Sequence, residues 1–426
     1  MVKIGDEVKL EIVDYTYDGL GVGKLDGFPI FVANTVIGET ILTRVEIVKK
    51  NLAFGKALKT ELNSERRVKP VCVNYSDCGG CQIMHMSYKE QLSFKTNHVK
   101  ETLKRVGNID TPVSDCIGMD YPYRYRNKLA IPFSNGESGL YKQGTHDIVS
   151  IEKCHILNRE AFRMYSYIKD LELAAKLKHL VIRNSYFRNQ YMIVLVSDKP
   201  LKDDITMITE KFANVVSIVN NINPGETNVI LGKKSNILHG EDYYEDYLIG
   251  NSYQISHRSF YQVNPAQTEK LFKKVMDTID YEDKTIVDAY SGIGTIGISL
   301  SLFAKYVHCI EVNEDAVNAG KESIRRNYID NVEFHLGKAE ELISTVLKED
   351  VDVVITDPPR KGCDELFIDA LIKSKIKEVI YISCNVSTLA RDLKLLADFY
   401  DVVEVAPFDM FPQTYHTEVF CYLKRK

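Results

Sequence analysis

The stretch Thr285-Ile-Val-Asp-Ala-Tyr-Ser-Gly-Ile-Gly-Thr-Ile-Gly297 decides the fold of the C-terminal part of this 426-residue chain. It reads as an apolar strand, a glycine turn and the start of a helix, in which Gly292 and Gly294 allow a tight turn and a close approach of the backbone to a ligand. Glu311 ends the next apolar segment, 23 residues after Asp288, where a carboxylate can accept hydrogen bonds from ribose hydroxyls. We therefore predict a nucleotide-type cofactor site; purely structural glycines, or a site for NAD or FAD, are the alternatives.

Around this stretch, apolar and helical segments alternate. A helix is expected over about 265–280, with Asn264 as its N-cap and Pro265 as its first residue. Strands are expected at Thr285–Tyr290, Val307–Val312, Val332–Leu336, Val351–Asp357, Val379–Cys384, Val402–Val405 and Glu418–Leu423. This alternation predicts a doubly wound α/β domain, placed at 256–426, whose ligands bind at the carboxyl ends of the parallel strands.

The charge of Asp288 favours one cofactor over the others. A carboxylate at the end of the first strand repels a pyrophosphate, but it suits the ammonium and sulfonium charges of S-adenosylmethionine. The stretch looks like the first motif of class I (Rossmann-like) methyltransferases. Asp357-Pro-Pro-Arg360, at the end of the fourth expected strand, supports this reading. Enzymes that methylate planar nitrogen groups usually carry an aromatic residue after Pro-Pro, so Arg360 argues for a different chemistry.

A cysteine follows the fifth expected strand, in Ser383-Cys384-Asn385, beside the cofactor crevice. We expect Ser387 to cap the next helix, whose N-terminus lowers the pKa of the thiol and favours a nucleophilic thiolate. Thiolate addition at carbon 6 of uracil makes carbon 5 nucleophilic enough to accept a methyl group, and Glu418 can then remove the carbon-5 proton. The alternatives are a packing cysteine and an ordinary strand-flanking glutamate.

Composition and charge describe an ordinary soluble protein. The chain has 45% hydrophobic and 27% charged residues and a formal net charge of -5. It has no run of about 18 apolar residues and no apolar signal segment at the N-terminus, so we expect a cytoplasmic protein without a membrane span. Residues 41–70 hold eight basic residues against three acidic ones, which favours either a phosphate-contacting surface or an ordinary solvated one.

The N-terminal 59 residues predict a small β-barrel. Val8, Leu10 and Ile12 alternate with charged residues, and Asp-Gly pairs supply turns before Phe28–Val32. Short strands and glycine turns in about 60 residues are typical of barrels of the oligonucleotide-binding type. The segment resembles the TRAM domain of RNA-modifying enzymes. Residues 60–255 mix strands and helices and form the expected central α+β domain, with strands at Leu180–Ile182 and Tyr191–Val196.

Four of the nine cysteines are spaced like metal ligands: Cys72, Cys78, Cys81 and the distant Cys154. A three-plus-one arrangement is more common for a [4Fe–4S] cluster than for structural zinc, with zinc or no metal as the alternatives. Four others have no such spacing and are expected to be packing residues: Cys116, Cys309, Cys363 and Cys421. Nearby, Tyr121-Pro-Tyr-Arg-Tyr-Arg-Asn-Lys128 interleaves aromatic and cationic residues, which suits either RNA stacking or ordinary packing.

Taken together, the ordered motifs resemble the RNA uracil-5-methyltransferase family. They are Phe260-Tyr-Gln262-Val-Asn264, Asp357-Pro-Pro-Arg360, Ser383-Cys384-Asn385 with the following Val386–Arg391, and Asp409–Glu418. The resemblance implies S-adenosylmethionine as methyl donor, Cys384 as nucleophile and Glu418 as base. It implies cofactor-site positions at Gln262, Tyr290, Thr295, Glu311 and Asp357, beside Asp288, Gly292 and Gly294 from the first motif. The resemblance also implies that Phe260, Gln262 and Asp357 contact a flipped-out uracil.

One position departs from the family pattern. Members often hold the adenine with Asn or Asp after the third strand, where this chain has Lys338 and Ala339. In the family, a TRAM-like barrel and the four cysteines accompany ribosomal RNA enzymes, whereas transfer RNA enzymes lack both. The resemblance therefore implies large-subunit (23S) ribosomal RNA as partner and a [4Fe–4S] cluster. Nothing in the sequence suggests more than a monomer.

Three other functions compete with this one. A transfer RNA uracil-5-methyltransferase is the nearest. A cytosine-5 enzyme would pair Pro-Cys with a second cysteine on the neighbouring strand, where this chain has Asp357-Pro-Pro-Arg360. An iron–sulfur RNA-binding scaffold without activity is disfavoured by the presence of Cys384, Glu418 and the glycine turn in one chain.

Overall fold

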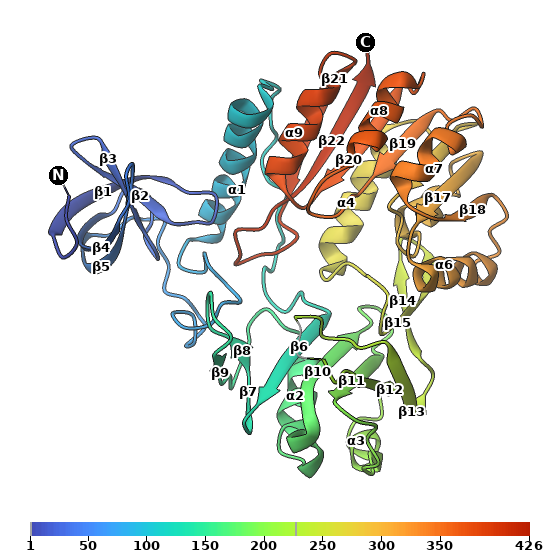
Figure 1. Cartoon of the computed structure of the whole chain (residues 1–426), viewed down its shortest axis with the longest axis horizontal. Coiled ribbons are helices and arrows are strands. Elements are labelled where there is room, and N and C mark those ends of the chain that lie inside the picture. Colours follow the sequence, from blue (N-terminus) through green and yellow to red (C-terminus); the bar gives the residue numbers. More distant parts are fainter. Residues whose placement is uncertain (1, 226–227) are drawn as a thin grey trace.

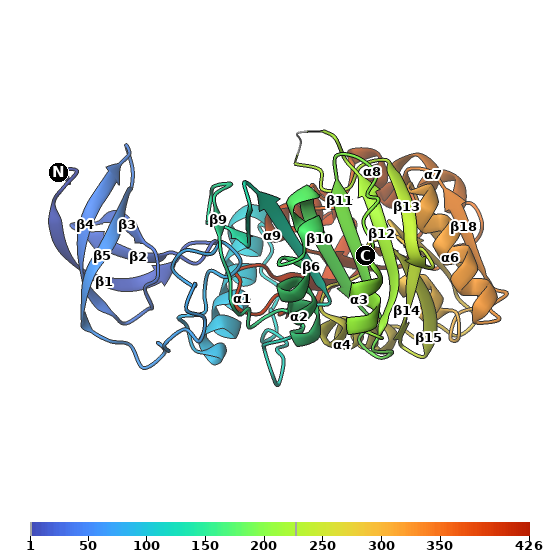
Figure 2. The same ribbon diagram turned by 90° about the horizontal axis from the view of Figure 1, so that it is seen from below.

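The computed structural model describes residues 2–225 and 228–426, which form a barrel, a central mixed sheet and a C-terminal, mainly parallel sheet (Figure 1). In both views the barrel lies at one end of the molecule, apart from the two sheets (Figure 2). Within the described residues, no helix combines the length and apolarity that a membrane crossing requires.

The N-terminal barrel is closed, in the order β1-β2-β3-β5-β4. Its strands are β1 (Glu7–Tyr15), β2 (Gly21–Leu25), β3 (Phe28–Val32), β4 (Thr40–Val48) and β5 (Ala53–Leu62). Leu10 and Ile12 point into its core, while Lys9 and Glu11 are solvent-exposed, because successive side chains of a strand alternate between its faces. The predicted small barrel is confirmed, and it has five strands.

Part of the basic segment 41–70 serves packing. Arg67 pairs with the buried Glu39 of the barrel, and Arg66 pairs at 3.1 Å with Glu90 at the start of α1 (Tyr88–Thr102). These ion pairs attach the linker after the barrel to both neighbours. The positive charge offered to a partner is therefore smaller than the residue count alone predicts.

The central sheet has the order β13-β12-β11-β10-β6-β7. Its elements are β6 (Lys128–Ser134), β7 (Glu137–Ser138), β10 (Leu177–Asn184), β11 (Tyr191–Ser197), β12 (Val215–Ile222) and β13 (Lys234–Gly240), with α2 (Arg159–Ile168), η2 (Glu172–Lys176) and α3 (Thr206–Lys211). One face packs on α2 and α3, and the other on the hairpin β14 (Tyr243–Leu248) and β15 (Asn251–Ser256). A small hairpin, β8 (Leu140–Tyr141) and β9 (Ile148–Val149), lies beside it. Both predicted central strands are present, as parts of β10 and β11.

The C-terminal sheet has the order β18-β17-β16-β19-β20-β22-β21, in which the first five strands are parallel and β22 is antiparallel to both neighbours. Its strands are β16 (Thr285–Ala289), β17 (Tyr306–Glu311), β18 (Val332–Leu336), β19 (Val353–Thr356), β20 (Glu378–Ser383), β21 (Tyr400–Phe408) and β22 (Glu418–Arg425). All seven predicted strands are found. The doubly wound α/β fold is confirmed.

Helices cover both faces of this sheet. One face carries α4 (Pro265–Thr278), α5 (Thr295–Leu300) and α6 (Glu314–Arg326); the other carries α7 (Ala339–Val346), α8 (Glu365–Lys373) and α9 (Val386–Leu396). The Asn264 side chain caps α4 by accepting a hydrogen bond from the Gln267 amide at 3.3 Å, as predicted.

The segment after the barrel reaches this second face. Helix α1 and η1 (Leu103–Gly107) pack beside α9, and Val113 and Ile117 form parallel bridges with Val405 and Phe408 of β21. The limits 59/60 and 255/256 stay predictions, but residues 88–117 adjoin the C-terminal sheet rather than the central one.

Candidate active site

The glycine turn after β16 ends beside a buried carboxylate. Gly292 and Gly294 have φ of 58° and 78°, and a side chain at Gly294 would clash with Phe334, so this turn requires glycine. Asp288 is 1% exposed, and its Oδ2 accepts a hydrogen bond from the Gly297 amide at 2.8 Å. Its Oδ1 has no partner among the described residues. An orphaned buried carboxylate oxygen is suited to a cationic ligand.

Glu311 is held in place at the end of β17. Its carboxylate accepts hydrogen bonds from the amides of Gly292 at 2.9 Å and Asn313 at 2.7 Å, and it is only partly buried. Thr295 begins α5 and is partly exposed at the same turn. Tyr290 has φ of 61°, and its ring lies 5.6 Å from that of Phe367. The sheet thus brings Tyr290, Thr295 and Glu311 to the carboxyl ends of the neighbouring parallel strands β16 and β17.

The loop after β18 differs from the family pattern, as its sequence implies. Lys338 stands at the N-cap position of α7 without a side-chain cap, and its ammonium pairs with Glu341 at 2.6 Å. Gly337 donates its amide to the backbone oxygen of Glu311 at 2.9 Å. Positions 338 and 339, which are Lys and Ala, therefore carry neither a side-chain amide nor a carboxylate.

Cys384 and Glu418 meet at the same edge of the sheet. Cys384 directly follows β20 and Glu418 begins the antiparallel β22, in which Val419 lies opposite Ser383. Asp357 follows β19, the neighbour of β20. Cys384 is partly exposed, whereas Glu418 is 3% exposed. The antiparallel last strand therefore brings its first residue to the carboxyl ends of the parallel strands.

The electrostatics of Cys384 correct one expectation. Burial and the neighbouring carboxyl groups of Glu418 and Asp357 raise the pKa of the Cys384 thiol to about 11, and Arg360 lowers it by less. Burial also raises the pKa of Asp357 to about 7, and burial followed by the charge of Asp357 raises that of Glu418. The pKa is therefore raised and not lowered as predicted, because desolvation and the neighbouring negative charges dominate.

The cap of the helix after Cys384 is also different from the prediction. Asn385, not Ser387, is the N-cap, and its side chain accepts hydrogen bonds from the amides of Ser387 and Thr388. The Asn385 amide group donates to the backbone oxygen of Arg360 at 3.1 Å. The Asp357-Pro-Pro-Arg360 loop is thus joined directly to the loop that carries the thiol.

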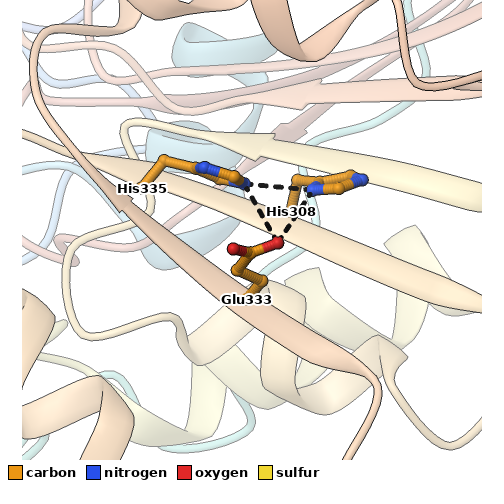
Figure 3. Close-up of side chains that lie close together, drawn as sticks. All are labelled: His308, Glu333 and His335. Atoms are coloured by element: carbon orange, nitrogen blue, oxygen red, sulfur yellow. Dashed lines mark hydrogen bonds and ion pairs between the residues drawn. The ribbon is translucent and has the colours of Figure 1, made fainter.

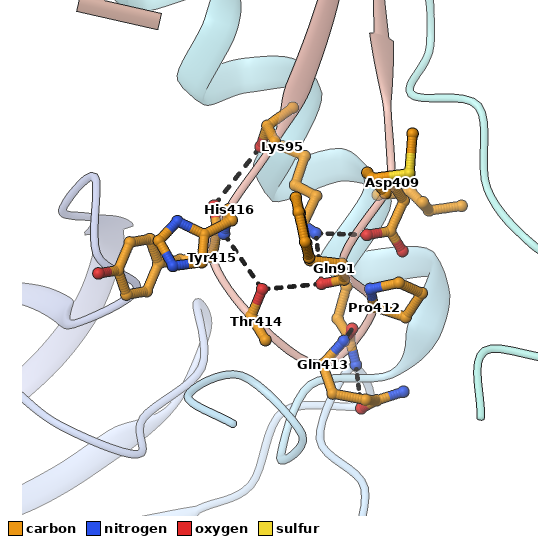
Figure 4. A network of polar contacts seen from close by, with 12 residues as sticks. Gln91, Lys95, Asp409, Pro412, Gln413, Thr414, Tyr415 and His416 are labelled. Carbon is orange, nitrogen blue, oxygen red and sulfur yellow. Dashed lines mark hydrogen bonds and ion pairs between the residues drawn. The ribbon is translucent and has the colours of Figure 1, made fainter. Parts of the chain in front are cut away.

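A polar network that sequence reasoning missed supports the segment before Glu418 (Figure 4). Lys95 of α1 pairs with Asp409, and neither side chain is exposed. Lys95 also donates to the backbone oxygen of Phe411 at 3.2 Å. Gln91 and Gln413 exchange hydrogen bonds, each of 3.0 Å, although Gln413 has φ of 72°. Partners more than 300 residues apart in the sequence gave no local signal that could have identified this network.

We expect Lys95→Met to destabilise the protein by about 3–5 kcal/mol, because it leaves the carboxylate of Asp409 buried without its cation. The free energy of unfolding, from urea denaturation, measures this cost. Lys100→Met, the same change at an exposed position of α1, serves as the control and should alter it by about 0.5 kcal/mol or less. Equal effects of the two substitutions would contradict a structural role for the ion pair.

Phe260 and Gln262 lie next to the central sheet. Phe260 is 69% exposed, and the backbone oxygen of Gln262 accepts a hydrogen bond from the Asn127 side chain at 3.0 Å. Asn127 belongs to the aromatic and cationic segment 121–128, which lines a cavity of about 230 Å³ with Arg124 and Arg126. The exposed rings of Tyr186 and Phe187 line this cavity too, and sequence reasoning missed both.

The four predicted metal ligands line one pocket. Cys72, Cys78, Cys81 and Cys154 are all free thiols, and the Gly80 amide lies 3.4 Å from the Cys78 sulfur. Within the described residues, no three of these sulfurs lie within 4.8 Å of one another. The four other cysteines expected to pack are buried: Cys116, Cys309, Cys363 and Cys421.

Comparisons with known proteins agree with this geometry. A family model described as tRNA (Uracil-5-)-methyltransferase matches residues 87–426. A Listeria innocua protein described as an uncharacterized RNA methyltransferase is 41% identical over 100% of this chain and 99% of its own length. A Clostridium tetani protein of the same description is 39% identical over 98% and 96%. The solved structure of Pyrococcus abyssi tRNA (uracil-54, C5)-methyltransferase in complex with S-adenosyl-L-homocysteine has a TM-score of 0.79 at 28% identity, covering 97% of this chain and 99% of that one.

Proposed function

The chain belongs to the RNA uracil-5-methyltransferase family, and on that premise we propose that it methylates carbon 5 of a uridine in large-subunit ribosomal RNA through a transient bond from Cys384. Membership of this family implies that the protein methylates uracil in RNA and that S-adenosylmethionine is the methyl donor. The residue assignments rest on one observation above all: Cys384, Asp357 and Glu418 converge at the end of β20 where the cofactor turn also opens.

In the proposed reaction, the Cys384 sulfur adds to carbon 6 of the uracil, and carbon 5 becomes the nucleophile. S-adenosylmethionine supplies an electrophilic methyl group to carbon 5. Glu418 then takes the carbon-5 proton, and the carbon–sulfur bond breaks to release Cys384 and the methylated ring. Because burial raises the pKa of Glu418, its carboxylate is a stronger base than an exposed one. Phe260 and Gln262 would contact the extruded base.

The cofactor fits the polar groups at the turn. The partnerless Oδ1 of Asp288 would accept a hydrogen bond from the cofactor ammonium, and the fixed carboxylate of Glu311 would accept from the ribose hydroxyls. Gly292 and Gly294 allow the ligand to approach the backbone. Gln262, Tyr290, Thr295 and Asp357 complete the proposed set.

Cofactor affinity should depend on pH through Asp288. Burial raises the pKa of Asp288 to about 7, so the carboxyl is largely neutral below that pH and attracts a cation only when ionised. We expect the affinity for S-adenosylmethionine to rise about tenfold between pH 5.5 and 7, as measured by calorimetry. Asp288→Asn should weaken binding and flatten this dependence, whereas Asp330→Asn, at an exposed position, should do neither. A pH-independent affinity in the unchanged protein would contradict the assignment.

The presence of the barrel alone cannot decide between ribosomal and transfer RNA as the substrate. The Pyrococcus abyssi transfer RNA enzyme aligns with 97% of this chain, so at least one transfer RNA enzyme shares a barrel of this kind. The expectation that such enzymes lack the barrel is therefore wrong. The four clustered cysteines still favour ribosomal RNA in our proposal, and transfer RNA is the second candidate.

Methylation of unmodified transcripts separates the two. We would incubate the protein and S-adenosylmethionine with a labelled methyl group in two separate reactions. One contains 23S ribosomal RNA transcripts and the other total transfer RNA transcripts, and the nucleosides of each are separated by chromatography. Labelled 5-methyluridine in ribosomal RNA alone supports the proposal. Label in transfer RNA alone would assign the second candidate, and label on another nucleoside would overturn the proposed chemistry.

We also propose that the four clustered thiols hold a [4Fe–4S] cluster. Tetrahedral zinc would bring all four sulfurs to about 3.8 Å from one another, whereas no three of them lie within 4.8 Å of one another in the described structure. A cluster would join Cys154 to the Cys72–Cys81 loop, and Gln82 and Ile83 of that loop donate their amides to the backbone oxygen of Gln413. The cluster would thus support both an RNA surface and the segment before Glu418.

Protein purified without oxygen should contain about four iron and four acid-labile sulfide per chain. Cys78→Ala should lose both, while Cys116→Ala, a buried cysteine outside the pocket, should retain them. One zinc per chain and no sulfide would contradict the cluster.

A further inference from the structure

Two histidines and a glutamate gather at the outer edge of the C-terminal sheet, on side chains that are not part of the proposed active site. His308 lies on β17, and Glu333 and His335 lie on the edge strand β18 (Figure 3). His308 is opposite Glu333 in the parallel register, and His335 follows two residues later. Because side chains alternate between the faces of a strand, all three point to the same face.

The donor atoms of these side chains converge. His308 Nδ1 lies 3.0 Å from His335 Nε2, and the Glu333 Oε2 lies 3.9 Å and 3.8 Å from these two nitrogens. Ligands bound to one ion at about 2.1 Å are separated by about 3.0–3.4 Å at octahedral or tetrahedral angles. The nitrogen pair already meets this separation, and Glu333, half-exposed, needs a shift of about 0.5 Å.

We propose that His308 Nδ1, His335 Nε2 and the Glu333 carboxylate bind a first-row divalent metal ion such as Zn²⁺ or Co²⁺. Two imidazoles and one carboxylate are donors that these ions prefer. The remaining coordination positions are open to water, since Glu333 is 52% and His335 22% exposed. Neither the family nor the proposed methyl transfer requires this ion.

A second carboxylate lies close to the other nitrogen of the buried histidine. Glu349, beyond α7, lies 3.7 Å from His308 Nε2, the nitrogen that does not face the cluster. With the proton of His308 on Nε2, on the side of this carboxylate, Nδ1 could turn its lone pair to a metal in place of the hydrogen bond that it shares with His335 Nε2. A metal-bound histidine is commonly oriented in this way by a carboxylate on its other nitrogen. The bound ion would join the edge strand β18 to β17, three residues before Glu311 of the cofactor site.

Titration of the full-length protein with Co²⁺ tests the proposal separately from the cysteine pocket. Cobalt bound by nitrogen and oxygen gives weak visible bands, whereas cobalt bound by thiolates also gives a strong sulfur-to-metal band in the near ultraviolet. Besides any cobalt taken up by the cysteine pocket, which the sulfur band reports, the unchanged protein should bind one equivalent without that band, and its melting temperature should rise. His335→Asn should weaken this binding at least tenfold, as should Glu333→Gln. His239→Asn, at an exposed position of β13, is the matched control and should bind like the unchanged protein.

Glu349→Gln should weaken binding about tenfold while retaining the bands, because it removes only the orienting group. Circular dichroism tests whether each variant is folded. If His335→Asn does not fold, the cobalt binding of Glu333→Gln tests the proposed site. Equal uptake by the unchanged protein and the folded variants, or uptake only with the sulfur band, would overturn the proposed site.

Discussion

Cys384→Ala should lower kcat/KM for RNA methylation by at least about 10⁴-fold, because in the proposed reaction its thiol is the group that activates carbon 5. The unactivated uracil ring is a poor nucleophile, so loss of the thiol removes the reaction path rather than slowing one step of it. Binding of S-adenosylmethionine should remain within about twofold, since the polar groups that would hold it lie on β16 and β17. Transfer of a labelled methyl group and calorimetry measure the two quantities.

Cys421→Ala is the matched control for this substitution. Cys421 lies on β22 opposite Tyr381 and is fully buried, so its loss should affect stability but leave the chemical step intact. Methyl transfer by Cys384→Ala at the rate of the control would contradict the role of the thiol. A parallel loss of activity in both variants, with cofactor binding also lost, would instead indicate misfolding.

Glu418→Gln should lower turnover by about 10²–10⁴-fold and leave the protein bonded to methylated RNA. The amide can take no proton from carbon 5, so elimination of Cys384 stalls after the methyl group has been transferred. The variant is nearly isosteric, and it removes a charge that raises the pKa of the Cys384 thiol, so the addition step itself should not be impaired. Denaturing electrophoresis with labelled RNA measures the retained adduct.

Glu404→Gln, in the middle of the neighbouring strand β21 and opposite Tyr422, controls for the loss of a carboxylate from this sheet at a position away from Glu418. It should turn over normally and retain no adduct. Normal turnover by Glu418→Gln would show that another group removes the proton. Loss of turnover without an adduct would place Glu418 before methyl transfer rather than after it.

The sheet and the barrel could be predicted because their local patterns agree with their surroundings. Strands such as β19, buried on both faces, appear as unbroken apolar runs, and the barrel strand β1 alternates because one of its faces meets water. The turn at Gly292 and Gly294 and the cap of α4 at Asn264 have strong local signals. The fold follows from such signals in sequence order.

The supporting interactions could not be predicted in this way. Nothing in the local sequence distinguishes Lys95 and Asp409 from other charged residues. Both are buried because α1 packs beside β21 in the tertiary structure. The pKa of Cys384 was predicted from its helix alone, whereas burial, followed by two carboxyl groups from other strands, raises it. The histidines of β17 and β18 likewise meet only through the register of parallel strands.

Mass spectrometry of the protein after incubation with 5-fluorouridine RNA and S-adenosylmethionine tests the central claim most directly. Fluorine replaces the proton that Glu418 must remove, so the methylated ring should stay bonded to the enzyme. The account predicts one RNA adduct that carries the transferred methyl group and maps to the peptide containing Cys384. An adduct on a different residue, or methylated RNA released without any adduct, would contradict it.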